Sequence, residues 1–202
     1  MKIVFRQVQL YKFLQYCNET NMDKIVLDCG AGGNCPPLAL FADHGYKTYG
    51  IELSDSQLEK AKEFEKENGL KLNIIKGDMR KLSFGDDSMS YVYSWGSIFH
   101  MSKNDIARSI NEIKRVLKPG GLCFVNFLSK DDFRYEQGEK IGYGEYIQDE
   151  DGSDVIHSYF DDEEAEKYLR DMNIIYKEKR VFHRIYEGKQ IRQGYIDYIF
   201  KK

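Results

Sequence analysis

Three acidic residues lie at or just after short apolar runs of the sequence: Asp28 and Glu52 each end one, and Asp78 follows a third after Lys76 and Gly77. Apolar runs of this length are typical of strands buried on both faces of a parallel sheet. In such a sheet, ligands bind beyond the carboxyl ends of the strands, where a carboxylate can accept the hydroxyl hydrogens of a ribose. The three positions therefore indicate a nucleoside-binding site, with a solvated strand-end charge or a turn-forming aspartate as the alternative.

A glycine-rich loop follows the first of these acids, and it consists of Gly30, Ala31, Gly32, Gly33 and Asn34. Glycine permits left-handed backbone angles and leaves no Cβ atom between a ligand and the main chain. A tight strand-to-helix turn without a ligand is the alternative interpretation. Glu52, which ends the second apolar run, favours a bound ligand, because its carboxylate can accept hydrogen bonds from the ribose hydroxyls.

The loop does not favour a nicotinamide or flavin dinucleotide. The dinucleotide fingerprint begun at Gly30 would need a third glycine at the position of Cys35, and Pro36 and Pro37 follow it. Two prolines remove N–H donors at the start of the next helix, where a pyrophosphate would bind. S-adenosylmethionine (SAM) has no phosphate and loses nothing by this, so SAM is the predicted cofactor.

The elements that position these residues alternate along the chain as in an α/β fold. We expect a Rossmann-like three-layer sandwich with a mostly parallel seven-stranded sheet and an antiparallel C-terminal strand pair. Helices are predicted over Phe5 to Cys17, Pro36 to Gly45, Ser54 to Asn68, Asn104 to Leu117 and Asp161 to Met172. Strands are predicted over Lys24 to Asp28, Lys47 to Leu53, Leu72 to Lys76, Met89 to Ser94, Leu122 to Leu128, Ile174 to Tyr186 and Ile191 to Phe200.

The composition fits one globular domain over residues 1–202, with 42% hydrophobic and 31% charged residues. A formal net charge of -3 and a pI near 5.9 give no general attraction to nucleic acid or anionic membranes. No stretch approaches the roughly 20 apolar residues that span a bilayer, so we expect a cytoplasmic protein. The residues do not specify an oligomeric state.

The cysteines lack C-x-x-C spacing. We expect buried free thiols and no metal site at Cys17, Cys29, Cys35 and Cys123.

Residues 129–160 interrupt the pattern with a polar stretch that is rich in tyrosine and phenylalanine. Tyr146 to Gln148 and Val155 to Tyr159 flank Asp151 and Gly152, which predicts a β-hairpin. This insertion is predicted to form a cap that lines a substrate site, or one that simply covers the sheet.

With these residues in hand, the sequence resembles the class I SAM-dependent methyltransferases over about Lys24 to Leu128. The similarity rests on four segments, Val26 to Gly33, Gly50 to Ser54, Gly77 to Met79 and Arg115 to Gly121. The combination is far more specific than any one segment.

The resemblance implies a role for most of the strand-end residues. Asp28 and the Gly30 to Gly32 backbone are expected near the methionine moiety of SAM, Glu52 and Leu53 at the ribose, Asp78 and Met79 at adenine, and Ser94, Trp95 and Gly96 beneath the sulfonium. Asn34 stands where many members carry another glycine. No arginine in the motifs is an evident partner for the methionine carboxylate, so Arg6 and Tyr11 on the first helix are the candidates.

Methyl transfer is an in-line displacement, and a base is needed only when the acceptor is protonated. His100 follows the fourth strand and is the candidate general base or acceptor-binding group, unless it packs structurally under the cap. Phe99, Tyr146 and His157 are further candidates on the acceptor side.

A small molecule is the leading acceptor class, with protein or RNA as alternatives. The sequence also leaves open a non-catalytic SAM-binding protein and, less favoured, a dinucleotide-dependent oxidoreductase.

Overall fold

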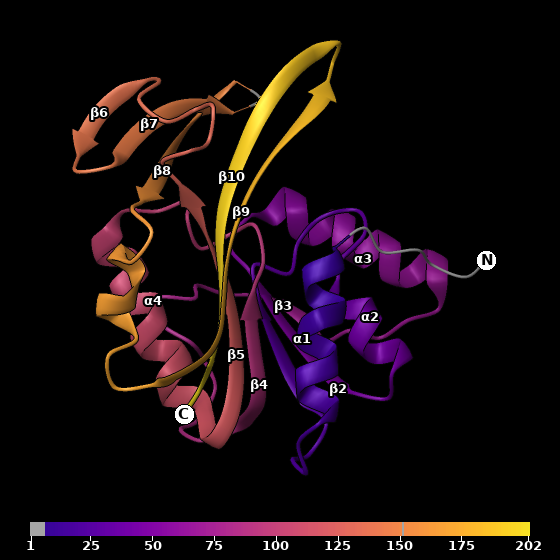
Figure 1. The fold of residues 1–202 in the computed structure, drawn as a ribbon. Helices are drawn as coiled ribbons and strands as arrows, with labels where there is room; N and C mark the ends of the chain where they lie inside the picture. The colour runs from indigo at the N-terminus through magenta and orange to yellow at the C-terminus, as the bar shows by residue number, and fades with distance from the viewer. Residues whose placement is uncertain (1–6, 151) are drawn as a thin grey trace.

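A computed structural model describes residues 7–150 and 152–202 of the chain (Figure 1). Its first helix, α1, spans Val8–Asn18, so the predicted helix start at Phe5 and the candidate Arg6 lie outside the described residues. Among the described residues, no helix combines the length and the apolar character that crossing a bilayer requires.

Among the described residues the sheet has ten strands, and not the seven expected, because three strands of residues 129–160 join it where Leu128 and Ser129 pair in parallel with Tyr159 and Phe160. The other seven strands correspond to those that the sequence predicts. Their order is β3-β2-β1-β4-β5-β10-β9, with the first five parallel and the last two antiparallel. The strands are β1 (Ile25–Cys29), β2 (Lys47–Glu52), β3 (Ile74–Lys76), β4 (Met89–Ser94), β5 (Leu117–Ser129), β9 (Asn173–Tyr186) and β10 (Lys189–Lys201). The predicted parallel sheet with a C-terminal antiparallel pair is confirmed.

Helices cover both faces of this sheet, because its strands are apolar on both sides. Val26 and Tyr91 pack in the core cluster of α1, α2 (Leu38–Asp43) and α3 (Asp55–Asn68). Their neighbours Leu27 and Val92 point the other way, into the cluster of α4 (Lys103–Val116) and the 3₁₀ helix η1 (Glu164–Tyr168). The three-layer arrangement is therefore confirmed (Figure 1).

Caps fix the helices that follow the strand ends. The Ser54 hydroxyl accepts a hydrogen bond from the Gln57 N–H at the start of α3, as its sequence predicts. Ser102 does the same for the Asp105 N–H at the start of α4. Such a cap contributes about 1 kcal/mol.

The predicted helix over Asp161 to Met172 is wrong, because only the short η1 forms there. The Asp162 carbonyl accepts a hydrogen bond of 3.2 Å from the Tyr198 hydroxyl of β10. The Asp161 side chain pairs with Lys130 at 2.7 Å. Contacts to β10 and to Lys130 after β5 thus fix the conformation of this acidic segment. They outweigh its local preference for a helix.

The insertion at 129–160 forms a three-stranded antiparallel sheet of β6 (Glu139–Gly142), β7 (Glu145–Glu150) and β8 (Ser153–Phe160). The predicted hairpin corresponds to β7 and β8, whereas β6 was not predicted. Beside the β9–β10 hairpin, this small sheet stands at the end of the main sheet where the parallel strands finish (Figure 1). We call residues 129–160 the cap.

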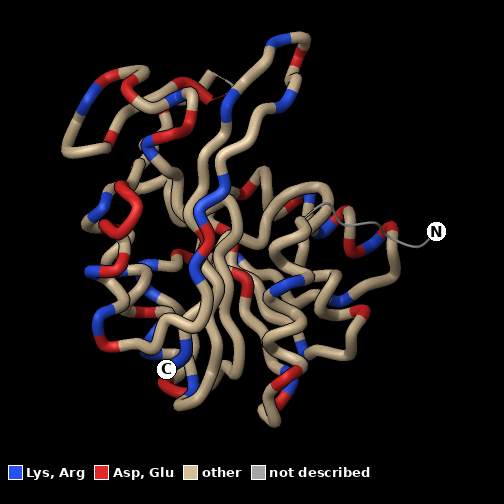
Figure 2. Tube along the Cα trace, in the orientation of Figure 1, with Lys and Arg blue, Asp and Glu red and all other residues tan. Residues whose placement is uncertain are grey.

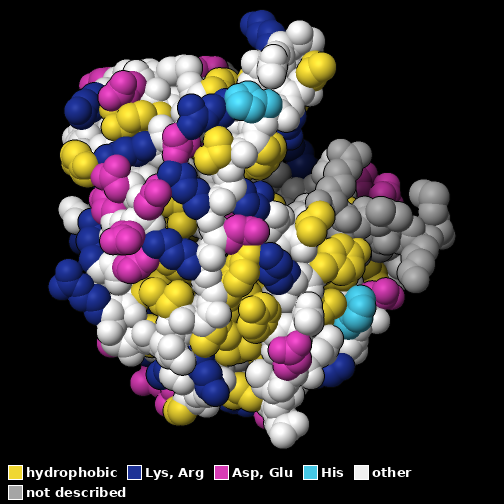
Figure 3. Space-filling model, in the orientation of Figure 1, with side chains coloured by type: hydrophobic (Ala, Val, Ile, Leu, Met, Phe, Trp, Pro, Cys, Tyr) yellow, Lys and Arg dark blue, Asp and Glu magenta, His cyan; other side chains and the backbone are white. Residues whose placement is uncertain are grey.

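Charges of both signs alternate along the chain and share the face seen in space-filling view, without a broad basic area there (Figures 2 and 3). Cys17, Cys29 and Cys123 are buried free thiols, as predicted, whereas Cys35 is half-buried.

Candidate functional site

Glu52 is tied to the glycine loop by its carboxylate. Its Oε2 atom accepts a hydrogen bond of 3.0 Å from the Gly32 N–H, and its Oε1 atom accepts one of 2.8 Å from the Ser54 N–H. A Cβ atom on Gly32 would lie 2.5 Å from Glu52 Oε2. Only glycine allows this approach, and each carboxylate oxygen keeps acceptor capacity for a ligand hydroxyl.

Gly30 also has a conformation that other residues would not adopt. Its φ angle is +107°, and a Cβ atom there would lie 2.2 Å from the Ser97 hydroxyl oxygen. The glycine therefore lets the loop backbone pack closely against Ser97, which follows β4.

Two adjoining cavities open over the carboxyl ends of β1 to β4. The first, of about 540 Å³, is lined by Gly30, Ile51, Glu52, Leu53, Ser54, Gly77, Asp78, Met79, Arg80, Ser97, His100, Met101 and Val155. The second, of about 870 Å³, is lined by Gln7, Asp28, Gly30, Gly32, Cys35, Pro37, Glu52, Ser54, Ser56, Gln57, Lys60, Trp95, Gly96, Ser97, His100, Glu150, Ser153 and Val155. They share Glu52, so one ligand held at this carboxylate can extend into both.

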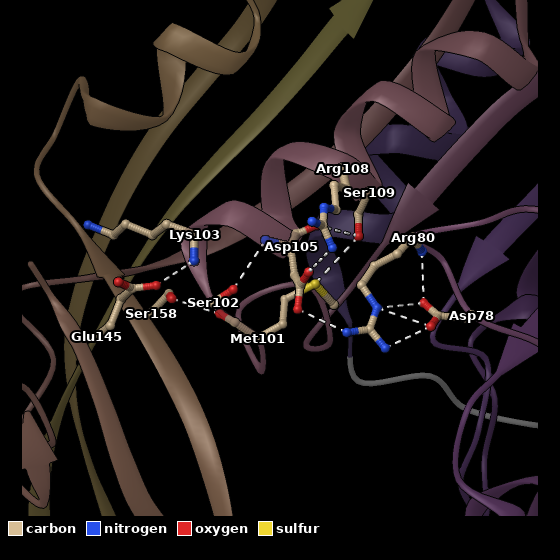
Figure 4. Close-up of polar contacts among 10 residues, drawn as sticks. All are labelled: Asp78, Arg80, Met101, Ser102, Lys103, Asp105, Arg108, Ser109, Glu145 and Ser158. Atoms are coloured by element: carbon tan, nitrogen blue, oxygen red, sulfur yellow. Dashed lines mark hydrogen bonds and ion pairs between the residues drawn. The ribbon is translucent and has the colours of Figure 1, made fainter. Parts of the chain in front are cut away.

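Asp78 lines the first cavity but is already engaged by Arg80. The Arg80 guanidinium donates to both Asp78 oxygens at 2.7 to 3.0 Å and to Asp105 at 2.9 Å, which ties the loop after β3 to α4 (Figure 4). Hydrogen bonds from Arg80 hold the pKa of Asp78 below its usual range. The sequence analysis did not predict Arg80 as a residue of the site. The only signal for it in the sequence is the acidic residue two positions before it, Asp78.

Asp28 is 1% exposed, and its Oδ1 atom has no hydrogen-bond partner among the described residues. Burial raises the pKa of Asp28 to about 8, the Tyr93 hydroxyl opposes this rise, and the Glu52 charge adds to it. A cationic ligand group near Asp28 would favour its charged form.

The residues after β4 divide between two roles. Trp95 and Gly96 line the second cavity, and the Gly96 N–H donates to Asn126 Oδ1 at 2.9 Å. Ser94 lines none of the cavities described here, because its buried hydroxyl donates to the Cys29 carbonyl at 2.8 Å. Its predicted place beneath the sulfonium stays a prediction.

Tyr11 and Asn34 are both exposed and line none of these cavities. Gln7 and Lys60 line the second cavity instead. The Gln7 Oε1 atom is buried without a hydrogen-bond partner among the described residues. Gln7 next to α1 and Lys60 on α3 are thus further candidates for binding a ligand in this cavity.

A third cavity of about 350 Å³ adjoins the other two at His100. Of the predicted acceptor residues, Phe99, His100 and His157 line it, whereas Tyr146 packs against Tyr135 and Tyr159 within the cap. The remaining lining residues are Gly96, Leu128, Asp132, Phe133, Arg134, Glu150, Tyr159, Arg184, Tyr186, Ile191, Gln193 and Tyr195. Most of these come from the cap and the β9–β10 hairpin, and the sequence singled out few of them.

His100 and His157 face each other across Glu150. Their rings are 4.6 Å apart between centroids, and Glu150 Oε2 lies 3.6 Å from both His100 Nδ1 and His157 Nε2. Burial, together with the charge of Arg134, lowers the pKa of His100 to about 4. Burial, with His100 and Arg134 nearby, likewise lowers the pKa of His157 to about 4. Both imidazoles are therefore neutral near pH 7.

A family model described as a methyltransferase domain matches residues 27–125, from β1 into β5. The sterol 24-C-methyltransferase of Pneumocystis carinii is 35% identical over 132 residues, which cover 61% of this chain and 34% of that protein. The sterol 24-C-methyltransferase of Clavispora lusitaniae is 31% identical over 176 residues, covering 80% of this chain and 46% of that protein. The chain spans less than half the length of these relatives.

Among solved structures, a SAM-dependent methyltransferase from Methanosarcina mazei has a TM-score of 0.75 and 22% sequence identity, covering 100% of this chain and 99% of that chain. This likeness shows that the α/β fold is that of SAM-dependent methyltransferases.

Proposed function

We propose that this chain is a class I SAM-dependent methyltransferase that moves the methyl group of SAM to a small molecule in the third cavity. A methyltransferase-domain model matches residues 27–125, and the fold is that of SAM-dependent methyltransferases. The observation that carries this proposal is the position of Glu52. It braces the glycine loop, lies between two cavities and leaves acceptor capacity on both oxygens.

The two cavities divide the cofactor between them. In this proposal, Glu52 and Leu53 bind the ribose, and Asp78 and Met79 contact adenine in the first cavity. Asp28, the backbone of Gly30 to Gly32, Gln7 and Lys60 hold the methionine moiety in the second cavity. Lys60 offers the positive charge that a carboxylate requires, and Asp28 offers a negative charge to an ammonium group.

When bound, SAM supplies a methyl group on a positively charged sulfur. The protein's task is to align a nucleophile about 3 Å from that carbon. Gly96 and His100 line both the second and the third cavity, and Trp95 lines the second, so these residues are proposed to border the reacting atoms.

The third cavity favours a polar or aromatic acceptor. Charged residues line it, namely Asp132, Arg134, Glu150 and Arg184, beside the rings of Phe99, Tyr159 and Tyr195. A wholly apolar acceptor would remove these charged groups from water and supply no polar partner in return, which is costly. We therefore propose an acceptor with a ring and an anionic or hydroxyl group. The cytoplasmic location expected from the sequence stays a prediction.

The test is a calorimetric titration of the purified chain with SAM and with its demethylated product. Glu52→Ala is expected to weaken both affinities at least tenfold. Glu59→Ala, which removes an exposed acid of α3 outside the cavities, is the matched control and should bind normally. A folded chain that does not bind SAM, or that prefers NAD, would overturn the proposal.

A further inference from the structure

We propose that His100, Glu150 and His157 form a binding site for a divalent transition-metal ion such as Zn²⁺, where the cofactor and acceptor cavities meet. Each side chain offers one ligand atom, and these three atoms lie within 4.8 Å of one another. His100 lines all three cavities, and Glu150 lines the second and third. An ion held there would face both the cofactor and the acceptor.

The spacing of the ligand atoms suits a metal ion better than direct pairing. Glu150 Oε2 lies 3.6 Å from each imidazole nitrogen, beyond the distance of a good hydrogen bond. Two ligand atoms that are each about 2.0 to 2.1 Å from a tetrahedral zinc ion are about 3.3 Å apart. A small inward movement of the side chains would therefore bring them into coordination.

Both nitrogens also lack another partner. His157 Nε2 and His100 Nδ1 are buried with no hydrogen-bond partner among the described residues, and the His157 side chain is only 2% exposed. An unsatisfied buried polar atom costs about 1 to 3 kcal/mol. A metal ion would satisfy both atoms at once, whereas a general base would need only one.

The second ring nitrogen of His157 makes a contact that is typical of metal-binding histidines. Its Nδ1 atom lies 3.3 Å from the Val155 carbonyl oxygen, to which it can donate a hydrogen. This contact favours the tautomer whose Nε2 atom carries a lone pair toward Glu150. Metal-binding histidines characteristically donate their other N–H to a carbonyl or carboxylate in this way.

The ligand set selects the kind of ion. Two imidazoles and one carboxylate suit Zn²⁺ and other first-row transition ions, with coordination positions left open for a substrate. Mg²⁺ and Ca²⁺ prefer oxygen ligands. Arg134 lines the same third cavity and opposes a cation, so its removal should strengthen binding.

The chemical role of the ion rests on the proposed function. An acceptor hydroxyl or thiol at an open coordination position would lose its proton to solvent more easily. The resulting oxygen or sulfur anion would form a bond to the methyl carbon as the bond between that carbon and the sulfonium sulfur breaks. No separate side-chain base is then required.

The experiment uses the full chain without a histidine tag, freed of metal by a chelator and titrated with Zn²⁺ in a calorimeter. One ion per chain with micromolar or tighter Kd is expected. Co²⁺ should give visible absorption bands typical of imidazole coordination. Glu150→Gln and His157→Ala should each weaken binding at least 30-fold, and Arg134→Gln should strengthen it.

His183→Ala is the matched control, because this exposed histidine lies far along the β9–β10 hairpin. Equal Zn²⁺ affinity in the wild type, Glu150→Gln and His157→Ala would overturn the site, as would no binding by the folded wild type. Glu150 is 41% exposed, so its variant tests the site even if His157→Ala misfolds. SAM titration of the same samples separates the proposals: SAM binding without zinc binding rejects the metal site alone, and the reverse rejects only the proposed function.

Discussion

The Asp28 carboxyl group lies at the end of β1, in the core beside Tyr93 and next to the second cavity. Its pKa rises from 3.8 to about 8 because the charged form is desolvated. Between these two values the folded chain holds a proton that the unfolded chain has released. The folded state then binds more protons, so the free energy of unfolding contributed by this group falls as the pH rises from about 4 to 8.

Asp28→Asn should remove this pH dependence, since an amide does not titrate. The difference in unfolding free energy, variant minus wild type, is expected to increase steadily between pH 5 and pH 8. Urea denaturation of both proteins at several pH values in this range measures it. Parallel curves for the two proteins would show that Asp28 is charged in the folded chain throughout.

Gly30→Ala should destabilise the chain by roughly 2 to 5 kcal/mol, through a strained backbone and a clash. Both effects follow from the φ angle of +107° and the 2.2 Å approach to Ser97. Gly85→Ala, at an exposed glycine with no atom within 4 Å of an added Cβ, is the control and should change little. Thermal or urea unfolding distinguishes them, and equal stability of the two variants would contradict the expected clash.

At the scale of elements, the site depends on contacts between loops and helices that are distant in sequence. Arg80 joins the loop after β3 to the first turn of α4 through Asp78 and Asp105. The start of α4 is in turn tied to the cap, because the Lys103 N–H donates to Glu145 of β7 at 2.6 Å (Figure 4). The first turn of α4 therefore connects the adenine side of the proposed site with the cap.

Arg80→Gln should loosen the loop that carries Asp78 and Met79, and we expect the affinity for SAM to fall about threefold to tenfold. Calorimetric titration measures this change. Arg108→Gln is the matched control, because Arg108 also pairs with Asp105 but is 73% exposed, and surface pairs contribute little. Unchanged affinity in Arg80→Gln would mean that the loop keeps its conformation without this network.

At the scale of the whole molecule, two extensions beyond the main sheet build the acceptor cavity. The cap contributes Arg134, His157 and Tyr159, and the β9–β10 hairpin contributes Arg184 and Tyr195. The glycine loop and Glu52, which carry the proposed cofactor site, belong to the main sheet. Acceptor and cofactor binding should therefore be separable.

Replacing residues 135–157 by a short glycine–serine linker is expected to keep most of the affinity for SAM and to abolish methyl transfer. Tyr159 and Phe160 remain in this variant because they are fully buried. Calorimetry and an acceptor screen against the wild type provide the two readouts. Loss of SAM binding together with cooperative unfolding would show instead that the cap is part of the core.

The sequence by itself determined the seven strands of the main sheet, the helices that follow its parallel strands, and the glycine loop with Glu52. These features depend on local signals: apolar runs, capping residues such as Ser54, and glycines at fixed distances from acids. Each feature is encoded within a few neighbouring residues, so the local sequence was sufficient to predict it. The cap hairpin was also predictable, because alternating residues flank a turn.

Only the tertiary structure decided which side chains meet. Glu150 joins His100 and His157, and Arg80 engages Asp78 and Asp105, through packing of segments far apart in sequence. The predicted helix over Asp161 to Met172 fails to form for the same reason, because long-range contacts to β10 override its local helix propensity. Side-chain pairing at long range depends on how strands register and elements pack, and no local pattern of residues records it.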